Sequence, residues 1–246
     1  METSGISETI ANNMIDKKVR NNVDNALKYM KQNNINVISV FDDDYPQMLK
    51  KIYDPPICFY IKGNLQLLKM QNISLIGCRK CSQYGKKTAY YFSYNLSKAG
   101  FNIVSGLARG IDSYSHIGCL AAKGKTIAVM GSGLDNIYPK DNEQLVNEII
   151  KQNGAIITQY PLGTKPEKNN FPARNRIISG LSKAVLVIEA RAKSGTLITV
   201  DFALEQGKDV FAVPGNINSA NSVGTNELIK QGAIPVCNYK DVLDNI

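Results

Sequence analysis

Arginine and lysine side chains beside glycine-rich turns are the groups in this sequence best suited to binding an anion. Small residues let backbone amides approach an oxyanion, and the planar guanidinium of arginine binds two oxygen atoms at once. Only six of the 29 basic residues are arginines, and five of these six lie in or beside turns rich in Gly, Ser or Asn. The turns span residues 77–82, 105–110, 131–133, 174–176 and 191–196. Their composition predicts a ligand rich in phosphate.

The net charge of +8 agrees with a polyanionic ligand but is explained nearly as well by lysines spread over a solvated surface. Known phosphate-binding loops do not fit the turns. Gly131 and Gly133 supply two glycines of a dinucleotide fingerprint, but Asn136 replaces the third small residue, and no Walker A lysine motif occurs. Each turn alone is weak evidence for a phosphate site, because a glycine after a strand usually serves only the turn geometry.

The segment 160–176 is long for a connection between a strand and a helix, and such long loops tend to be functional. It combines Lys165, Lys168, Arg174 and Arg176 with a single phenylalanine, Phe171. Cations beside an aromatic ring are typical of single-stranded nucleic acid binding. Phe171 serves equally well as an apolar staple for a helix that begins at Pro172, and the spacing leaves both interpretations open.

Few residues of the sequence have the types and spacing that catalysis or metal binding would need. His116 lies one turn after Asp112 on an expected helix, where a base paired with Asp112 or Ser115 is conceivable but a structural imidazole is favoured. Asp112 follows Gly110 and is expected to cap that helix, and Pro139 is expected to start the next one. The five cysteines are scattered, and the single Cys-x-x-Cys has no second pair at zinc spacing. We expect no catalysis, no metal ion and no cofactor.

The segments that must position these residues alternate between short apolar runs and helical patterns from residue 72 onward. The expected strands span residues 73–77, 102–106, 126–131, 155–160, 184–190 and 209–215, with helices at about 84–99, 110–123, 141–152, 171–182, 197–207 and 224–231. This alternation predicts a Rossmann-like, doubly wound α/β fold with a mostly parallel sheet. In such sheets ligands bind beyond the carboxyl ends of the strands, which is where the turns fall.

Residues 1–70 form a different segment. They contain only two of the 19 glycines and predict a helix at about 17–33 and strands at 35–40 and 57–63. We expect a short α/β N-terminal extension at 1–70 and a core domain at 71–246. No run of the sequence has the length of apolar residues that a membrane span needs, and the first twenty residues lack the apolar centre of a signal peptide. A cytoplasmic protein with reduced thiols and no membrane partner is expected.

Six motifs occur in an order that resembles the DNA-processing protein DprA (Smf) family. They are IGCRKCSQYG, SGLARGID, GSGLDNIYP, FPARNRIISGLS, SGTLITVDFALEQGKDVFAVPG and GTNELIKQGA, preceded by DYPQMLKKIYDPP. The resemblance covers residues 40–236. It implies a Rossmann-like core that binds single-stranded DNA, forms a homodimer and helps load the recombinase RecA during natural transformation, without catalysis.

Matched motif by motif, the resemblance places a phosphate-binding turn at Gly77-Cys78-Arg79, with Cys78 where the family usually has Ser or Thr. It implies that Lys168 and Phe171 contact DNA, which favours base stacking for Phe171, and that the stretch Thr225–Ile234 builds the dimer interface. A complete helical domain before the core and a C-terminal winged-helix domain are not expected. The candidate DNA-binding residues are Gly77, Arg79, Lys80, Ser82, Ser105, Gly106, Arg109, Lys168, Phe171, Arg174, Asn175, Arg176, Ser194, Gly195 and Thr196.

An alternative is an enzyme or a nucleotide sensor. The turn at Gly195-Thr196 also resembles the LOG-type nucleotide phosphoribohydrolases, whose PGGxGTxxE motif carries an acid–base glutamate. Here Leu197, Ile198 and Thr199 follow, and Asp201 is not at the motif's spacing. A binding protein is therefore favoured over a hydrolase, while a pocket for a mononucleotide stays open.

Overall fold

The computed structural model describes residues 17–246, so residues 1–16 of the expected N-terminal extension lie outside the described part. The chain divides into two compact units, residues 1–36 and 37–246. In the first unit, helix α2 (Lys17–Gln32) matches the helix predicted at 17–33. The division of the sequence at residue 70 stays a prediction.

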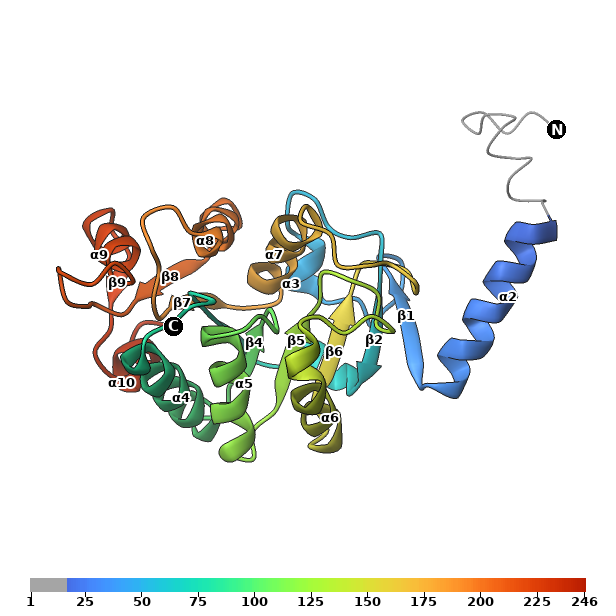
Figure 1. Cartoon of the computed structure of the whole chain (residues 1–246), viewed down its shortest axis with the longest axis horizontal. Coiled ribbons are helices and arrows are strands. Elements are labelled where there is room, and N and C mark those ends of the chain that lie inside the picture. Colours follow the sequence, from blue (N-terminus) through green and yellow to red (C-terminus); the bar gives the residue numbers. More distant parts are fainter. Residues whose placement is uncertain (1–16) are drawn as a thin grey trace. The chain divides into compact units, whose positions relative to one another are not determined.

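A nine-stranded sheet forms the centre of the second unit, in the order β1-β2-β6-β5-β4-β3-β7-β8-β9 (Figure 1). The strands are β1 (Ile35–Ser39, of which residues 37–39 belong to the second unit), β2 (Cys58–Gly63), β3 (Asn72–Ile76), β4 (Asn102–Ser105), β5 (Thr126–Val129), β6 (Ala155–Thr158), β7 (Ala184–Val187), β8 (Asp209–Ala212) and β9 (Ile234–Pro235). Strands β3 to β9 pair in parallel, and β2 pairs with β6 in the antiparallel sense.

Strand β3 lies between β4 and β7 and marks the point where the order of the strands reverses. From β3 the chain proceeds through β4, β5 and β6 toward one end of the sheet, and it then returns to β7, β8 and β9 on the other side. The loops that follow β3 and β7 therefore leave the sheet side by side in opposite directions. This topological switch point is where open α/β sheets bind ligands.

Helices cover both faces of the sheet, because alternate side chains of each strand point to opposite faces. One face carries α3 (Gln47–Lys50), α7 (Asn170–Gly180), α8 (Gly195–Glu205) and α9 (Val223–Lys230) (Figure 1). The other carries α4 (Gln83–Lys98), α5 (Ile111–Ala121), α6 (Glu143–Lys151) and α10 (Tyr239–Leu243). In β7, for example, Val185 and Val187 pack with the first group, whereas Ala184 and Leu186 pack with the second.

The predicted Rossmann-like fold is confirmed, and the predicted elements match to within a few residues. The 3₁₀ helices at Leu65–Lys69 and Lys140–Asn142 and the elements α3, β9 and α10 were not predicted, because each is too short to show a periodic pattern. The expectation that Pro139 precedes a helix is confirmed, since it caps the 3₁₀ turn that leads into α6.

Candidate functional site

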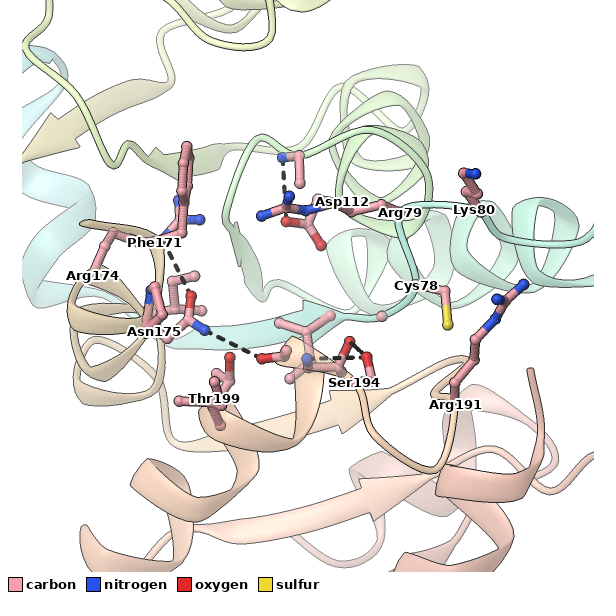
Figure 2. A pocket seen from close by; sticks show the side chains of 18 of the residues that line it. Cys78, Arg79, Lys80, Asp112, Phe171, Arg174, Asn175, Arg191, Ser194 and Thr199 are labelled. Carbon is pink, nitrogen blue, oxygen red and sulfur yellow. Dashed lines mark hydrogen bonds between the residues drawn. The ribbon is translucent and has the colours of Figure 1, made fainter. Parts of the chain in front are cut away.

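A cavity of about 690 Å³ opens at the carboxyl ends of β3 and β7, at the topological switch point (Figure 2). Loops after β3, β4, β5, β6 and β7 contribute to it, together with the first turns of α5, α7 and α8. Ten of the predicted site residues line it, namely Gly77, Arg79, Lys80, Lys168, Phe171, Arg174, Asn175, Ser194, Gly195 and Thr196. Turns separated by more than 100 residues in sequence are thus brought together in one cavity.

Five cations surround the opening, and all are exposed: Arg79, Lys80, Lys168, Arg191 and Lys193. Asn221 ties two of their loops together. Its Nδ2 donates to the carbonyl of Lys80 at 3.1 Å, and its Oδ1 accepts from Nε of Arg191 at 2.9 Å. We call these five residues the rim. Arg191 and Lys193 are absent from the predicted set, although the turn that carries them was recognised.

Glu189, two residues after the end of β7, holds the turn that carries Arg79. Its buried carboxylate accepts from the backbone N–H of Ser82 at 2.9 Å and from the Ser82 hydroxyl at 2.5 Å, while its carbonyl accepts from the N–H of Cys78 at 2.9 Å. Ser82 also caps α4 by accepting from the N–H of Gly85 at 3.0 Å. The Ser82 side chain is therefore engaged beneath the turn and does not line the cavity.

The N-terminus of α8 faces the cavity from the opposite side. Ser194 caps this helix by accepting from the N–H of Thr196 at 3.2 Å, and Asn175 of α7 donates to the carbonyl of Gly195 at 3.4 Å. Several N–H groups of the first turn of a helix have no partner within the helix, and the helix dipole places partial positive charge there. Together with the charges of the rim, this terminus provides the positive potential that an anion would require.

Phe171 lies between three neighbours on the cavity wall. The guanidinium carbon of Arg79 is 5.3 Å from its ring centroid, and the ring of Tyr138 is 5.6 Å away and inclined by 47°. A methyl group at Gly131 would lie 3.0 Å from the Phe171 ring, so a side chain there would require the ring to shift by a few tenths of an ångström. Figure 2 shows the Arg79 side chain reaching toward Phe171 across the top of the cavity. Phe171 belongs to α7, which begins at Asn170 instead of at Pro172.

Arg174 and Asp112 form the floor of the cavity. Only 3% of Arg174 is exposed, and its Nη1 donates to the carbonyl of Gly106 at 2.7 Å and to that of Val129. Burial lowers the pKa of Arg174 to about 10. Burial also raises the pKa of Asp112 above its ordinary value, while the nearby Arg174 opposes that rise. Gly106 has no room for a side chain, since a methyl group would lie 2.8 Å from Nη2 of Arg174.

The expectation that Asp112 caps α5 is wrong. Gly110 occupies the capping position with a φ of 82°, and Asp112 lies in the first turn, where its Oδ2 accepts from the N–H of Ala108 at 3.3 Å. A side chain at Gly110 would meet the carbonyl oxygen of Cys78 at 2.3 Å, which makes glycine obligatory there. The tight contact between these two turns moves the carboxylate to the cavity floor.

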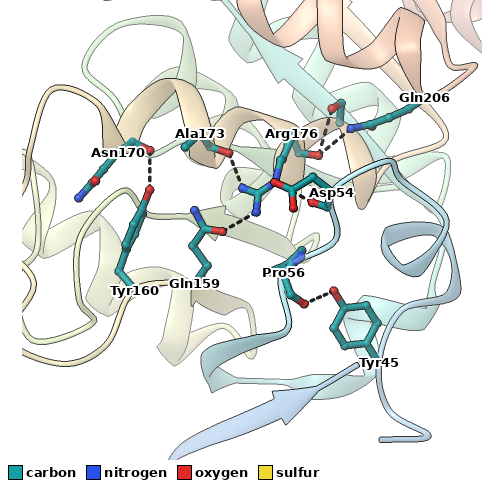
Figure 3. A network of polar contacts seen from close by, with 10 residues as sticks. Tyr45, Asp54, Pro56, Gln159, Tyr160, Asn170, Ala173, Arg176 and Gln206 are labelled. Carbon is teal, nitrogen blue, oxygen red and sulfur yellow. Dashed lines mark hydrogen bonds and ion pairs between the residues drawn. The ribbon is translucent and has the colours of Figure 1, made fainter. Parts of the chain in front are cut away.

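Four further predicted residues lie outside the lining of the cavity. Ser105 donates to the carbonyl of Leu75 at 2.7 Å, and Gly106 lies under Arg174. Arg109 forms an exposed ion pair with Asp141 at 2.8 Å. Arg176 donates to the carbonyl of Ala173 at 2.6 Å and to Gln159 at 2.8 Å, and it pairs with Asp54 at 3.0 Å (Figure 3).

His116 lies beneath the site and does not line the cavity. Its Nδ1 is 2.7 Å from the hydroxyl of Thr126, and burial lowers the pKa of the imidazole to about 3. Ser115 donates to the carbonyl of Ile111, so it makes no pair with His116. The geometry favours the structural interpretation over a catalytic base. Among the described residues, no group of three His, Cys, Asp or Glu side chains could hold a metal ion, and no helix there is long and apolar enough to cross a membrane.

Comparison with known proteins agrees with this architecture. The family model described as DNA recombination-mediator protein A matches residues 36–246. The chain belongs to the DNA recombination-mediator protein A family. Members similar to it include Protein Smf of Escherichia coli, 41% identical over 92% of this chain and 61% of that protein, and DNA processing protein DprA of Streptococcus pneumoniae, 46% identical over 83% of this chain and 72% of that protein. The chain thus spans less than two thirds of the length of the Escherichia coli protein.

Solved structures of this family have the same fold. The X-ray structure of DNA processing protein A from Streptococcus pneumoniae covers 97% of this chain and 86% of its own, with a TM-score of 0.84 and 40% identity. The Helicobacter pylori protein, whose structure is described for its unique single-stranded DNA binding mode, covers 85% and 94%, with a TM-score of 0.75 and 31% identity. The fold and the recombination-mediator family are therefore established for this chain.

Proposed function

We propose that this protein binds single-stranded DNA in the cavity between the loops after β3 and β7. The observation that carries the proposal is the gathering of five exposed cations and an aromatic wall around one opening at the switch point of the sheet. Cations that follow a backbone, combined with flat side chains that stack on bases, are what single-stranded nucleic acid binding requires. The Helicobacter pylori relative, described for its single-stranded DNA binding mode, supports the same function here.

In this proposal the rim and the N-terminus of α8 bind phosphate oxygens. The guanidinium of Arg79 offers a bidentate fork, and Lys168, which lines the same cavity, provides a point charge. Phe171 supplies an apolar surface beside both. Backbone contacts of this kind carry no base sequence information, so binding is expected to be tolerant of sequence and strongly dependent on salt.

The wider role of the family extends the proposal. A single-stranded DNA-binding protein of this type would protect incoming DNA and help load RecA during natural transformation, acting as a homodimer in the cytoplasm. The stretch Thr225–Ile234 includes the start of β9, the last strand at one end of the sheet, and an end strand with free edge groups favours pairing with a second copy. Thr225 and Leu228 are buried within the subunit, so the exposed Glu227, Lys230 and Gln231 would make the contact.

A binding role also fits the residues at the start of α8 better than hydrolysis does. After Gly195 and Thr196, α8 continues with Leu197, Ile198 and Thr199, so it lacks the glutamate of the phosphoribohydrolase motif. Asp201 is exposed and does not line the cavity. The carboxylate at the floor, Asp112, is held by the N–H of Ala108 beside the Arg174 guanidinium. We therefore propose that no base is released from nucleoside monophosphates.

A titration of labelled (dT)30, the matching duplex and thymidine monophosphate at two salt concentrations tests the function. We expect the single strand to bind more tightly than the duplex and the mononucleotide, and its affinity to fall as salt rises. Equal affinity for single strand and mononucleotide would favour a nucleotide sensor. No binding of the single strand at low salt would refute the proposal, and release of free base would refute the absence of catalysis.

A further inference from the structure

The surroundings of Phe171 leave little of its ring for a nucleobase. Arg79 lies over the ring, Tyr138 packs against it at 5.6 Å, and the backbone of Gly131 approaches it closely. The cation over the ring and the ring itself stabilise each other, and in doing so they hold the guanidinium at the opening of the cavity. A base that stacked on the same face of Phe171 would have to displace Arg79 from the ring.

Tyr138 is the more accessible of the two aromatic residues. Its exposed fraction is 43% and it lines the same cavity, whereas the neighbouring Phe171 is less exposed. Tyrosine suits an exposed stacking position because its ring is apolar and flat while its hydroxyl tolerates water. A side chain that is packed on one side and open on the other offers a stacking surface without a large rearrangement.

The loop that carries Tyr138 is held by its own hydrogen bonds. The hydroxyl of Ser132 donates to the carbonyl of Asn136 at 2.7 Å, and the N–H of Asn136 donates to the carbonyl of Gly133 at 2.9 Å. Asp135 accepts from the N–H of Gly163 at 2.8 Å and ties this loop to the loop after β6. Because the loop is already ordered, placing a base on Tyr138 costs little conformational entropy.

We propose that Tyr138 is a base-stacking residue of this cavity, with Phe171 supporting its ring and holding Arg79. The inference rests on the proposed binding of single-stranded DNA. It assigns the phosphate to Arg79 and a base of the same strand to Tyr138, with Phe171 between the two. Tyr138 lies in the motif GSGLDNIYP, where the sequence alone predicts only a turn before the next helix.

The test compares two probes of equal length and charge, labelled (dT)12 and a labelled abasic phosphodiester of twelve units, by fluorescence anisotropy. Tyr138→Leu keeps apolar bulk but removes the aromatic face, and Tyr138→Phe keeps the face. Tyr53→Leu is the matched control, since Tyr53 is 100% exposed and does not line the cavity. Thermal melting of each variant checks that it is folded.

Tyr138→Leu should weaken binding of (dT)12 by about fivefold or more and leave binding of the abasic probe unchanged. Tyr138→Phe and Tyr53→Leu should bind both probes as the wild type does. Equal losses on both probes, or no loss on (dT)12, would overturn the stacking role while leaving the proposed function intact. Failure of the wild type to bind (dT)12 would instead overturn the proposed function itself.

Discussion

The rim and the floor of the cavity use the same kind of side chain in opposite ways. On the rim, Arg79 and Arg191 are exposed, and their guanidinium groups are held from one side by Phe171 and by Asn221. On the floor, Arg174 is buried and donates to the carbonyls of Gly106 and Val129. Exposure and hydrogen-bond partners, and not residue type, separate an arginine that is accessible to a ligand from a structural one.

The floor joins the ends of β4 and β5 to α7 through buried hydrogen bonds, whereas the hydrogen bonds of the rim, such as that of Arg191 with Asn221, are exposed. A buried arginine that satisfies two strand-end carbonyls fixes the loops on which the rim residues stand. The rim cations are then free to bind a ligand, because their removal leaves no buried polar group without a partner. The comparison predicts that floor variants change stability and that rim variants change affinity.

The largest effect is expected for Arg174→Met. This change leaves two buried carbonyls without a donor and Asp112 without its neighbouring cation, so the free energy of unfolding should fall by about 3–5 kcal/mol. Urea denaturation followed by circular dichroism measures it. Arg79→Met, at the rim, is the matched control and should change stability by less than about 0.5 kcal/mol. Similar stabilities for both variants would break the distinction between floor and rim.

The pH dependence of stability should also come from the buried side of the site. The pKa of His116 is about 3 in the folded chain and 6.5 ordinarily, so below pH 6.5 the unfolded chain binds a proton that the native state does not. The free energy of unfolding should therefore fall as the pH falls from 6.5 toward 3, by at most about 1.4 kcal/mol per pH unit from this group. The contribution is constant above pH 6.5.

Asp112 acts in the opposite direction, because its raised pKa lets the native state take up a proton first as the pH falls. The contribution of His116 is isolated by comparing the wild type with His116→Gln in urea at pH 7.5, 6 and 5. The variant should show a weaker decline of stability between pH 6 and 5. The same decline in both proteins would mean that the buried imidazole is not its source.

Much of the fold and part of the site could be predicted from the sequence. The alternation of apolar runs and helical patterns predicts the parallel sheet, and the position of the turns after the strands predicts the edge of the sheet at which the cavity opens. The periodicity of a helix could have separated Arg174 from Arg176, since residues two positions apart point about 200° apart on its surface. In the structure Arg174 lies at the cavity floor, whereas Arg176 pairs with Asp54 (Figure 3).

Other features depend on contacts between distant segments. The burial of Asp112 follows from the close approach of Gly110 to the turn after β3, and the place of Tyr138 follows from its packing on Phe171 of α7. Arg109 lies in a glycine turn like that of Arg79, yet it is paired with Asp141 away from the cavity. Nothing in the local sequence distinguishes these two arginines.

The smallest expected effect is a change in the salt dependence of DNA binding, which should differ between variants of Arg79 and Arg109. Arg79→Ala should weaken binding of every single-stranded sequence to a similar extent and lower the slope of log affinity against log salt by about 0.7, the contribution of one phosphate contact. Arg109→Ala removes the same formal charge but lies outside the cavity lining. It should leave the slope and the melting temperature unchanged.

This pair of variants, titrated with (dT)30 over a series of salt concentrations, tests the central claim most directly. A reduced slope for Arg79→Ala beside an unchanged slope for Arg109→Ala is the predicted result, and it would assign phosphate binding to the rim of the cavity. Equal slopes for the wild type and both variants would contradict the account, because the net charge of the protein and not this cavity would then attract the strand.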